Sequence, residues 1–179
     1  MKNPTVVVLA LITGFLLMPM GICADEPLSE SHSAQEFVQD FYTWYMQDIN
    51  SDRNMSLVEF ALKMKPQFFS EKIVKGLTED IEAQSKSPDY VVGIDFDPFL
   101  NGQDTCEPYR TGKVTFVGHA YRVEVFGQGS CEHRKQPDVI PAVERRNGSW
   151  VFVDFYYPGD GDLFSALRLA KKEREKTKK

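Results

Sequence analysis

From Ser33 to about Met46, hydrophobic residues recur among polar ones at the spacing of a helix. The aromatic residues that fall on one face of this helix are Phe37, Phe41, Trp44 and Tyr45. Ser33-Ala34-Gln35-Glu36 lies directly before them and is a capping box, whose serine and glutamate satisfy free N–H groups at a helix start. We therefore expect a helix that begins at Ser33 and buries an aromatic face.

Two further helices are predicted after it. A second capping box, Ser56 to Glu59, opens a helix that ends before Pro66, because proline lacks an N–H and clashes with the preceding turn. Ser70 caps the third helix. The apolar residues of this helix recur every four positions, at Ile73, Leu77 and Ile81.

Beyond Pro88 the pattern becomes that of β-strands. Runs rich in β-branched and aromatic residues cover 114–117, 120–126, 139–145 and 150–157. Gly118-His119 separates the first two runs and Asn147-Gly148 the last two, and both dipeptides suit two-residue hairpin turns. We therefore expect two antiparallel hairpins.

Helices followed by strands predict an α+β fold, in which the N-terminal helices pack on a curved antiparallel sheet. Asp162 caps a short C-terminal helix. The sheet and the first helices are expected to form a cone with an open mouth. This single α+β domain covers residues 33–170, between a disordered leader over 25–32 and a basic frayed tail over 171–179.

Residues 1–24 read as a secretory signal peptide. Lys2 precedes an apolar run over 6–18, and Cys23-Ala24 offers small residues for cleavage. The run is shorter than the roughly 20 residues that cross a bilayer. We expect export, to the periplasm of a Gram-negative bacterium, with no stable membrane anchoring. The alternative is a lipoprotein in which Cys23 carries the lipid.

Composition narrows the functional classes. The chain has 179 residues, of which 42% are hydrophobic, and its formal net charge is −5. That length suits one domain, and the acidic balance argues against a nucleic-acid partner. The sequence lacks the Gly-x-Ser-x-Gly, His-Glu-x-x-His and Cys-x-x-Cys motifs of common hydrolases, metalloproteases and redox proteins. No cofactor is predicted.

Two cysteines, Cys106 and Cys131, remain after signal cleavage, and an oxidising compartment permits a disulfide between them. The first predicted hairpin places Gly112 beside Phe126 at its open end. Each cysteine lies a similar number of residues beyond that end. We therefore predict a disulfide between Cys106 and Cys131.

The loop after the first helix resembles a calcium loop. Its oxygen-bearing residues are Asp48, Asn50, Asp52, Asn54, Ser56 and Glu59, at positions 1, 3, 5, 7, 9 and 12. Arg53 occupies the position that a calcium loop gives to glycine, and the capping box already accounts for Ser56 and Glu59. We interpret the loop as a polar connection without a metal.

Three aspartates are candidates for binding or for acid–base chemistry. Asp97 and Asp104 flank a turn-rich segment whose apolar residues predict that it is pressed onto the domain, and Asp154 lies among aromatic residues of the last long strand. Trp150 on the same strand is a candidate binding residue. His119 is interpreted as an exposed turn residue.

Four short motifs occur in an order that resembles a known family. They are 41–45, 97–104, 147–150 and 161–164. The chain resembles, from about Ala34 to Leu169, the exported bacterial family called domain of unknown function 3828. This resemblance implies a cystatin-like cone similar to nuclear transport factor 2, with three helices on a curved antiparallel sheet. It implies no activity and no catalytic residues.

Two functional hypotheses follow. The first is a non-enzymatic exported binding module for a small molecule or a protein partner, which includes inhibitor and immunity roles. The alternative is an isomerase, dehydratase or hydrolase that uses Asp97, Asp104 or Asp154 in the cone. An enzyme needs two convergent polar groups with perturbed acidity in one pocket, whereas a binder needs an apolar mouth or patch.

Overall fold

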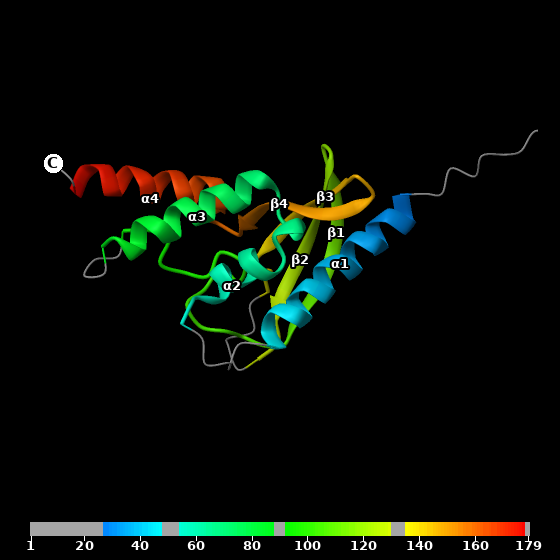
Figure 1. Ribbon diagram of the computed structural model, residues 1–179. Helices are drawn as coiled ribbons and strands as arrows, with labels where there is room; N and C mark the ends of the chain where they lie inside the picture. Colours follow the sequence, from blue (N-terminus) through cyan, green and yellow to red (C-terminus); the bar gives the residue numbers. More distant parts are fainter. Residues whose placement is uncertain (1–26, 48–53, 88–91, 130–134, 178–179) are drawn as a thin grey trace, which may run out of the picture.

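Helices precede an antiparallel sheet in this protein, as the order of its hydrophobic patterns predicts (Figure 1). The computed structural model describes residues 27–47, 54–87, 92–129 and 135–177. The helices are α1 (Pro27–Gln47), α2 (Leu57–Met64), the short 3-10 helix η1 (Pro66–Phe68), α3 (Glu71–Ser85) and α4 (Leu163–Thr177). The predicted α+β class is confirmed. Among the described residues, no helix has both the length and the apolar character needed to cross a membrane.

The sheet is an antiparallel meander in which each strand pairs with the next. Its strands, in spatial order, are β1 (Tyr109–Val117), β2 (Ala120–Gly127), β3 (Ile140–Arg146), β4 (Ser149–Tyr157) and β5 (Gly161–Asp162). The pairing shifts register between Thr111 and Val114 in β1, and again where Ala142 pairs with Asp154 but Val143 pairs with Phe152. Such bulges bend a strand and increase its twist.

Both predicted hairpin turns are present. Gly118 joins β1 to β2 with a φ of 66°, a left-handed conformation that glycine adopts without steric cost. Asn147 and Gly148 join β3 to β4 with φ values of 50° and 83°. Two successive positive φ values define the type I′ turn, whose twist matches that of the flanking strands.

Helix α1 packs against one face of the sheet, and aromatic rings fill the space between them. Phe41 contacts Phe152 of β4 with ring centroids 4.8 Å apart, and stacks on Tyr45 at 5.3 Å. Phe99 from the loop before β1 is fully buried, and its ring lies 5.1 Å from that of Phe69. The predicted aromatic face of the first helix is confirmed.

The loop from Asp97 to Asn101 forms one side of this core. The Tyr42 hydroxyl donates to the Phe99 carbonyl at 2.6 Å, and the Tyr157 hydroxyl donates to the Pro98 carbonyl at 3.2 Å. The loop is therefore pressed onto the domain, as its apolar residues predict.

The start of α1 differs from the prediction. The helix begins at Pro27 and not at Ser33, so residues 27–32 are helical and not a disordered leader. Proline suits a first helical turn because the N–H that it lacks would have no partner there. The Ser33 side chain accepts a hydrogen bond from Trp150 Nε1 at 2.9 Å instead of capping a helix. Contact with the sheet thus extends the helix beyond its local start signal.

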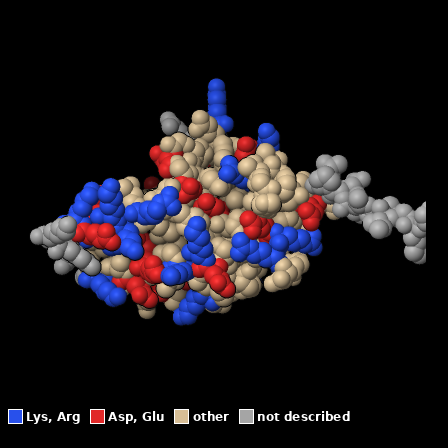
Figure 2. Space-filling model, turned by 90° about the horizontal axis from the view of Figure 1, so that it is seen from above, with Lys and Arg blue, Asp and Glu red and all other residues tan. Residues whose placement is uncertain are grey.

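The C-terminal tail also differs from the prediction. Helix α4 continues to Thr177, where a frayed tail from residue 171 was expected. Lysine and arginine side chains gather at this end of the molecule, where α3 and α4 lie side by side (Figure 2). Arg174 and Lys176 in the last turn interact favourably with the helix dipole, and Arg174 also pairs with Asp80 of α3.

Candidate functional site

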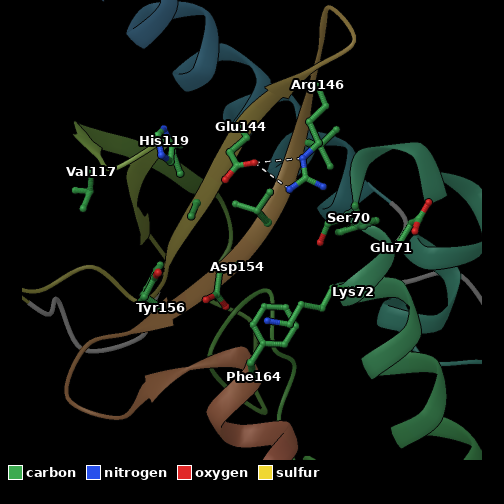
Figure 3. A pocket seen from close by; sticks show the side chains of 15 residues that line it. Ser70, Glu71, Lys72, Val117, His119, Glu144, Arg146, Asp154, Tyr156 and Phe164 are labelled. Atoms are coloured by element: carbon green, nitrogen blue, oxygen red, sulfur yellow. Dashed lines mark hydrogen bonds and ion pairs between the residues drawn. The ribbon is translucent and has the colours of Figure 1, made fainter.

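A cleft lies on the face of β3 and β4 that is turned away from α1. Side chains of a strand alternate between the two faces of a sheet, so Val151 and Tyr156 point away from the aromatic core that holds Phe152 and Phe155. The hollow has a volume of about 850 Å³. We call it the outer cleft; its principal lining residues are Ala142, Val151, Val153, Asp154, Tyr156, Lys72, Phe164 and His119 (Figure 3).

The walls of the outer cleft come from the first turns of α3 and α4 and from the turn between β1 and β2. Phe69 bridges to Phe152 at the free edge of β4, and the Ser70 N–H donates to the Phe152 carbonyl at 2.8 Å. This contact places the first turn of α3, with Lys72, beside the sheet. Phe164 enters from the first turn of α4, and the turn between β1 and β2 forms the opposite rim.

Asp154 is the predicted site residue that the structure places in this cleft. It is half-buried and points into the hollow, with Lys72 and Phe164 on one side and Tyr156 on the other (Figure 3). Burial raises the pKa of its carboxyl to about 6. A hydrogen bond from the Phe155 N–H at 2.8 Å lowers this pKa and offsets part of the effect of burial. The negative charge of Asp162 also raises this pKa, whereas the charges of Lys72 and Arg122 lower it.

Two cations flank Asp154, and each lies over an aromatic ring. Lys72 Nζ is 3.6 Å from the centroid of the Phe164 ring, and Arg122 Cζ is 3.8 Å from that of Tyr156. The negative face of an aromatic ring attracts a cation and holds it in place. Within the described part of the chain, neither cation forms an ion pair with a carboxylate.

Three other polar side chains of the cleft, those of Arg146, Glu144 and Ser70, make structural contacts. Arg146 binds Glu144 on the same strand, with Nη2 2.9 Å from Oε2. Ser70 Oγ accepts from the Ile73 N–H at 3.4 Å and caps α3, as the sequence predicts. The Ser70 hydroxyl therefore serves as a helix cap.

Asp97 lies elsewhere, between the core and a depression that α2 and α3 border. Its Oδ2 accepts from the Tyr45 hydroxyl at 2.6 Å, and its Oδ1 accepts from the Phe99 N–H at 2.8 Å. Burial raises the pKa of Asp97 to about 6, and these hydrogen bonds oppose the rise. Asp104 is exposed. The three predicted aspartates therefore do not converge on one pocket.

The remaining candidates have structural positions. Trp150 is 9% exposed, donates to Ser33 Oγ and packs edge-on against Tyr121 at 5.5 Å, so it belongs to the core and not to the outer cleft. His119 occupies the exposed turn after Gly118, as predicted, and contributes to the rim of the cleft.

The predicted loop at the calcium-like sequence is described only in part. Asp48, Asn50 and Asp52 lie outside the described residues. Ser56 Oγ accepts from the Glu59 N–H at 3.2 Å, which confirms Ser56 as the cap of α2. In the part of the chain that the structure describes, no three His, Cys, Asp or Glu side chains are grouped closely enough to hold a metal.

Cys106 is disulfide-bonded. Its predicted partner Cys131 lies outside the described residues, so the pairing stays a prediction. The hairpin is longer than the sequence suggests: Tyr109 pairs with Gly127, and Phe126 pairs with Arg110 and not with Gly112. A Cβ atom on Gly127 would lie 2.5 Å from Cys106 Cβ, so glycine at this position permits the close approach of the cysteine.

Sequence reasoning missed Lys72, Arg122, Tyr156 and Phe164. Side chains alternate along β2, so Arg122 points to the other face of the sheet from the buried Tyr121 and Val123. This alternation could have identified Arg122 as a residue of the outer face. The approach of Lys72 had no such signal, because it depends on how α3 folds back beside β4.

No model of a known protein family, no curated protein and no solved structure matches this chain. The resemblance to domain of unknown function 3828 and to the cone of nuclear transport factor 2 stays a prediction.

Proposed function

We propose that this protein is a non-enzymatic binding module that holds a small organic molecule in the outer cleft. The observation that carries the proposal is the cleft itself, a hollow of about 850 Å³ whose lining combines apolar residues, among them Ala142, Val151 and Val153, with charged side chains. Small-molecule sites have volumes of roughly 300–1,000 Å³ and need both apolar surface and polar groups. The face under α1, in contrast, is filled by aromatic rings.

The arrangement of the carboxyl groups favours binding over catalysis. Acid–base chemistry by two aspartates requires that both reach one substrate. Asp154 borders the outer cleft, Asp97 is bonded to Tyr45 near a different depression, and Asp104 is exposed. The three aspartates that the isomerase, dehydratase or hydrolase hypothesis invoked therefore do not share this cleft.

A neutral apolar dye tests the proposal. We expect N-phenyl-1-naphthylamine to bind one site on the protein with a rise in fluorescence, because the cleft floor is apolar. Ala120 lines the cleft beside the β1–β2 turn, and Ala120→Phe fills space there with a residue that suits a strand. This variant should lose at least about tenfold in affinity, since a large side chain excludes the dye.

Thr78→Phe is the matched control. It adds the same ring at an exposed position of α3 that does not line the cleft. Its affinity for the dye should equal that of the unmodified protein, with an unchanged melting temperature in both variants as the check on folding. Absence of binding to the unmodified protein, or equal binding to Ala120→Phe, would contradict the proposed function.

A further inference from the structure

Strand β1 lies at the edge of the sheet, and α1 covers only part of that edge. The helix crosses the sheet diagonally, so its middle meets β1 while its start lies over β4 (Figure 1). Gln39 accepts from the Thr111 N–H at 3.0 Å and donates to the Tyr109 carbonyl at 3.1 Å. Gln35 donates to the Gly112 carbonyl at 2.9 Å. The two glutamines thus satisfy the outward backbone groups of the first half of β1.

The second half of β1 has outward backbone groups on Val114 and Phe116. Val117 and Ala120 flank the two-residue turn and pair with each other, so they exchange both backbone hydrogen bonds. The alternation of an antiparallel pair then turns the N–H and C=O groups of Val114 and Phe116 away from β2. Within the described residues, these four groups have no hydrogen-bond partner. An unpaired edge of this kind is a template for another strand.

The side chains of this free edge include exposed apolar residues. Phe116 is 59% exposed and Val117 is 42% exposed. The Phe116 ring lies 4.8 Å from that of Tyr121, which holds it beside the edge of the sheet. Lys113 carries the charge of this stretch and forms no ion pair in the part of the chain that the structure describes. Burial of the apolar side chains would favour association with another strand.

We propose that two copies of this protein associate through β1, with the two strands antiparallel and a two-fold axis at Thr115. In this register Val114 lies opposite Phe116 of the second copy, and the two residues exchange both of their backbone hydrogen bonds. The symmetry repeats this pair on the other side of the axis. All four free backbone groups of each copy are then satisfied, and the two sheets become one continuous sheet.

The side chains of β1 are complementary to themselves in this register, which favours a second copy as the occupant. On one face Phe116 meets Val114 of the second copy, and pairs of aromatic and β-branched residues stabilise antiparallel strands. On the other face Thr115 meets Thr115 of the second copy, a pair that can share a hydrogen bond. Lys113 lies opposite Val117 of the second copy, so the pairing does not place two cations directly opposite each other.

A cysteine at the axis tests the register. Thr115→Cys places two thiols in a non-hydrogen-bonded pair whose Cα atoms are about 4.5 Å apart, a distance that a disulfide spans. Lys113→Cys is the matched control, because it puts an exposed thiol on the same strand but opposite Val117 of the second copy. Both variants are made in the full chain with Cys23→Ser, so that Cys23 adds no thiol. After mild oxidation, Thr115→Cys should give at least about fivefold more covalent dimer than Lys113→Cys.

Sedimentation equilibrium measures the association without a crosslink. The full chain should show a reversible monomer–dimer equilibrium, with a dimer fraction that rises with concentration. Phe116→Lys should raise the dissociation constant at least about tenfold, because it removes the apolar pair with Val114 and adds a cation to the edge. Leu169→Lys is the control: it makes the same change of an exposed apolar residue on α4, and should leave the dissociation constant unchanged.

Each measurement can overturn the proposal. A chain that stays monomeric at every concentration would leave this edge to a strand of a different protein and would exclude the two-fold pairing. A dimer that Phe116→Lys leaves intact would place the association on another surface. Equal crosslinking of Thr115→Cys and Lys113→Cys would exclude the axis at Thr115. None of these results changes the test of the outer cleft, which measures dye binding.

Discussion

The carboxyl group of Asp97 lies beside the aromatic core, and both of its oxygens accept hydrogen bonds there. Tyr45 donates to Oδ2 and the Phe99 N–H donates to Oδ1. Burial nevertheless raises the pKa of Asp97 to about 6. The folded protein thus binds a proton at this position more tightly than the unfolded chain, whose aspartates have a pKa near 3.9. Folding stability must then depend on pH.

We expect the contribution of Asp97 to the free energy of unfolding to be greatest below pH ~4 and to be lost as pH rises through about 6. The sign follows from the raised pKa, because ionisation is less favourable in the folded state. Asp97→Asn removes the charge. Its amide oxygen can accept from the Phe99 N–H, and its amide nitrogen can donate to the Tyr45 oxygen, which reverses the direction of that hydrogen bond. Urea unfolding between pH 4.5 and 7.5 measures the effect.

Relative to the unmodified protein, Asp97→Asn should gain stability as pH rises across that interval. Asp104→Asn makes the same substitution at an exposed position after the same turn, and should follow the unmodified protein at every pH. Parallel curves for Asp97→Asn and the unmodified protein would show that Asp97 does not titrate in this way. Asp154, whose pKa is also raised, contributes in the same direction to all three proteins.

Single residues also show where prediction from the sequence ends. The Asp-Pro dipeptide predicts a turn at Asp97, because its side chain binds local backbone, and the bond to Phe99 confirms it. The bond to Tyr45 connects residues 52 positions apart, and no local pattern predicts it. Trp150 likewise meets Ser33 across 117 positions, which makes it a core residue where a binding residue was considered.

At the scale of elements, Asp80 and Arg174 fix α4 to its neighbours. Asp80 is 3% exposed; its Oδ2 accepts from the Ile94 N–H at 2.9 Å and from Gln84 Nε2 at 3.0 Å. Arg174 donates to Asp80 Oδ1 and also to the Val92 carbonyl at 2.9 Å. One guanidinium group therefore connects the end of α4 to α3 and to the segment that follows α3.

We expect Arg174→Met to lower the free energy of unfolding by about 3 kcal/mol, because it leaves the Asp80 carboxylate buried without its cation. Hydrogen exchange of the amides in the last turns of α4 should accelerate in the same variant. Lys176→Met is the control, since Lys176 pairs with Glu173 on the exposed surface of the same helix and such a pair contributes less than about 1 kcal/mol. Equal losses in the two variants would contradict the anchoring role of Arg174.

Elements defined by local chemistry were predicted well. Ser56 and Ser70 cap their helices, and Asn147-Gly148 forms its turn, because each signal acts within four residues of the chain. The start of α1 and the end of α4 were predicted wrongly. Both depend on contacts with distant elements, through Ser33 and Arg174, which extend a helix past its local signals.

At the scale of the whole molecule, the outer cleft lies on the face of the sheet turned away from α1. The sequence did not predict a site on that face. Alternation along the strands shows that each has two faces, and α1 predicts which face holds the aromatic core. The outer cleft exists because the starts of α3 and α4 meet the edge of β4 and leave the middle of β3 and β4 open. That geometry depends on loop paths, which hydrophobic patterning does not encode.

The disulfide of Cys106 bears on where the whole molecule resides. The chain has three cysteines, and the predicted removal of residues 1–24 would take Cys23 with it. Cys131 would then be the intramolecular partner that remains for the disulfide-bonded Cys106. Closing a loop of this length stabilises a small domain by about 3 kcal/mol, chiefly by restricting the unfolded chain. Such a bond persists in an exported protein and is rare in a reducing cytosol.

We therefore expect protein recovered from the periplasm to begin at Asp25 and to contain the Cys106–Cys131 disulfide. Intact mass should show cleavage after Ala24, with no alkylation of cysteine under denaturing, non-reducing conditions and two alkyl groups after reduction. Cys131→Ser should expose one thiol and lower the melting temperature, because the loop is no longer closed. A diacylglycerol on Cys23 would establish the lipoprotein instead, and two free thiols in the exported chain would exclude the disulfide.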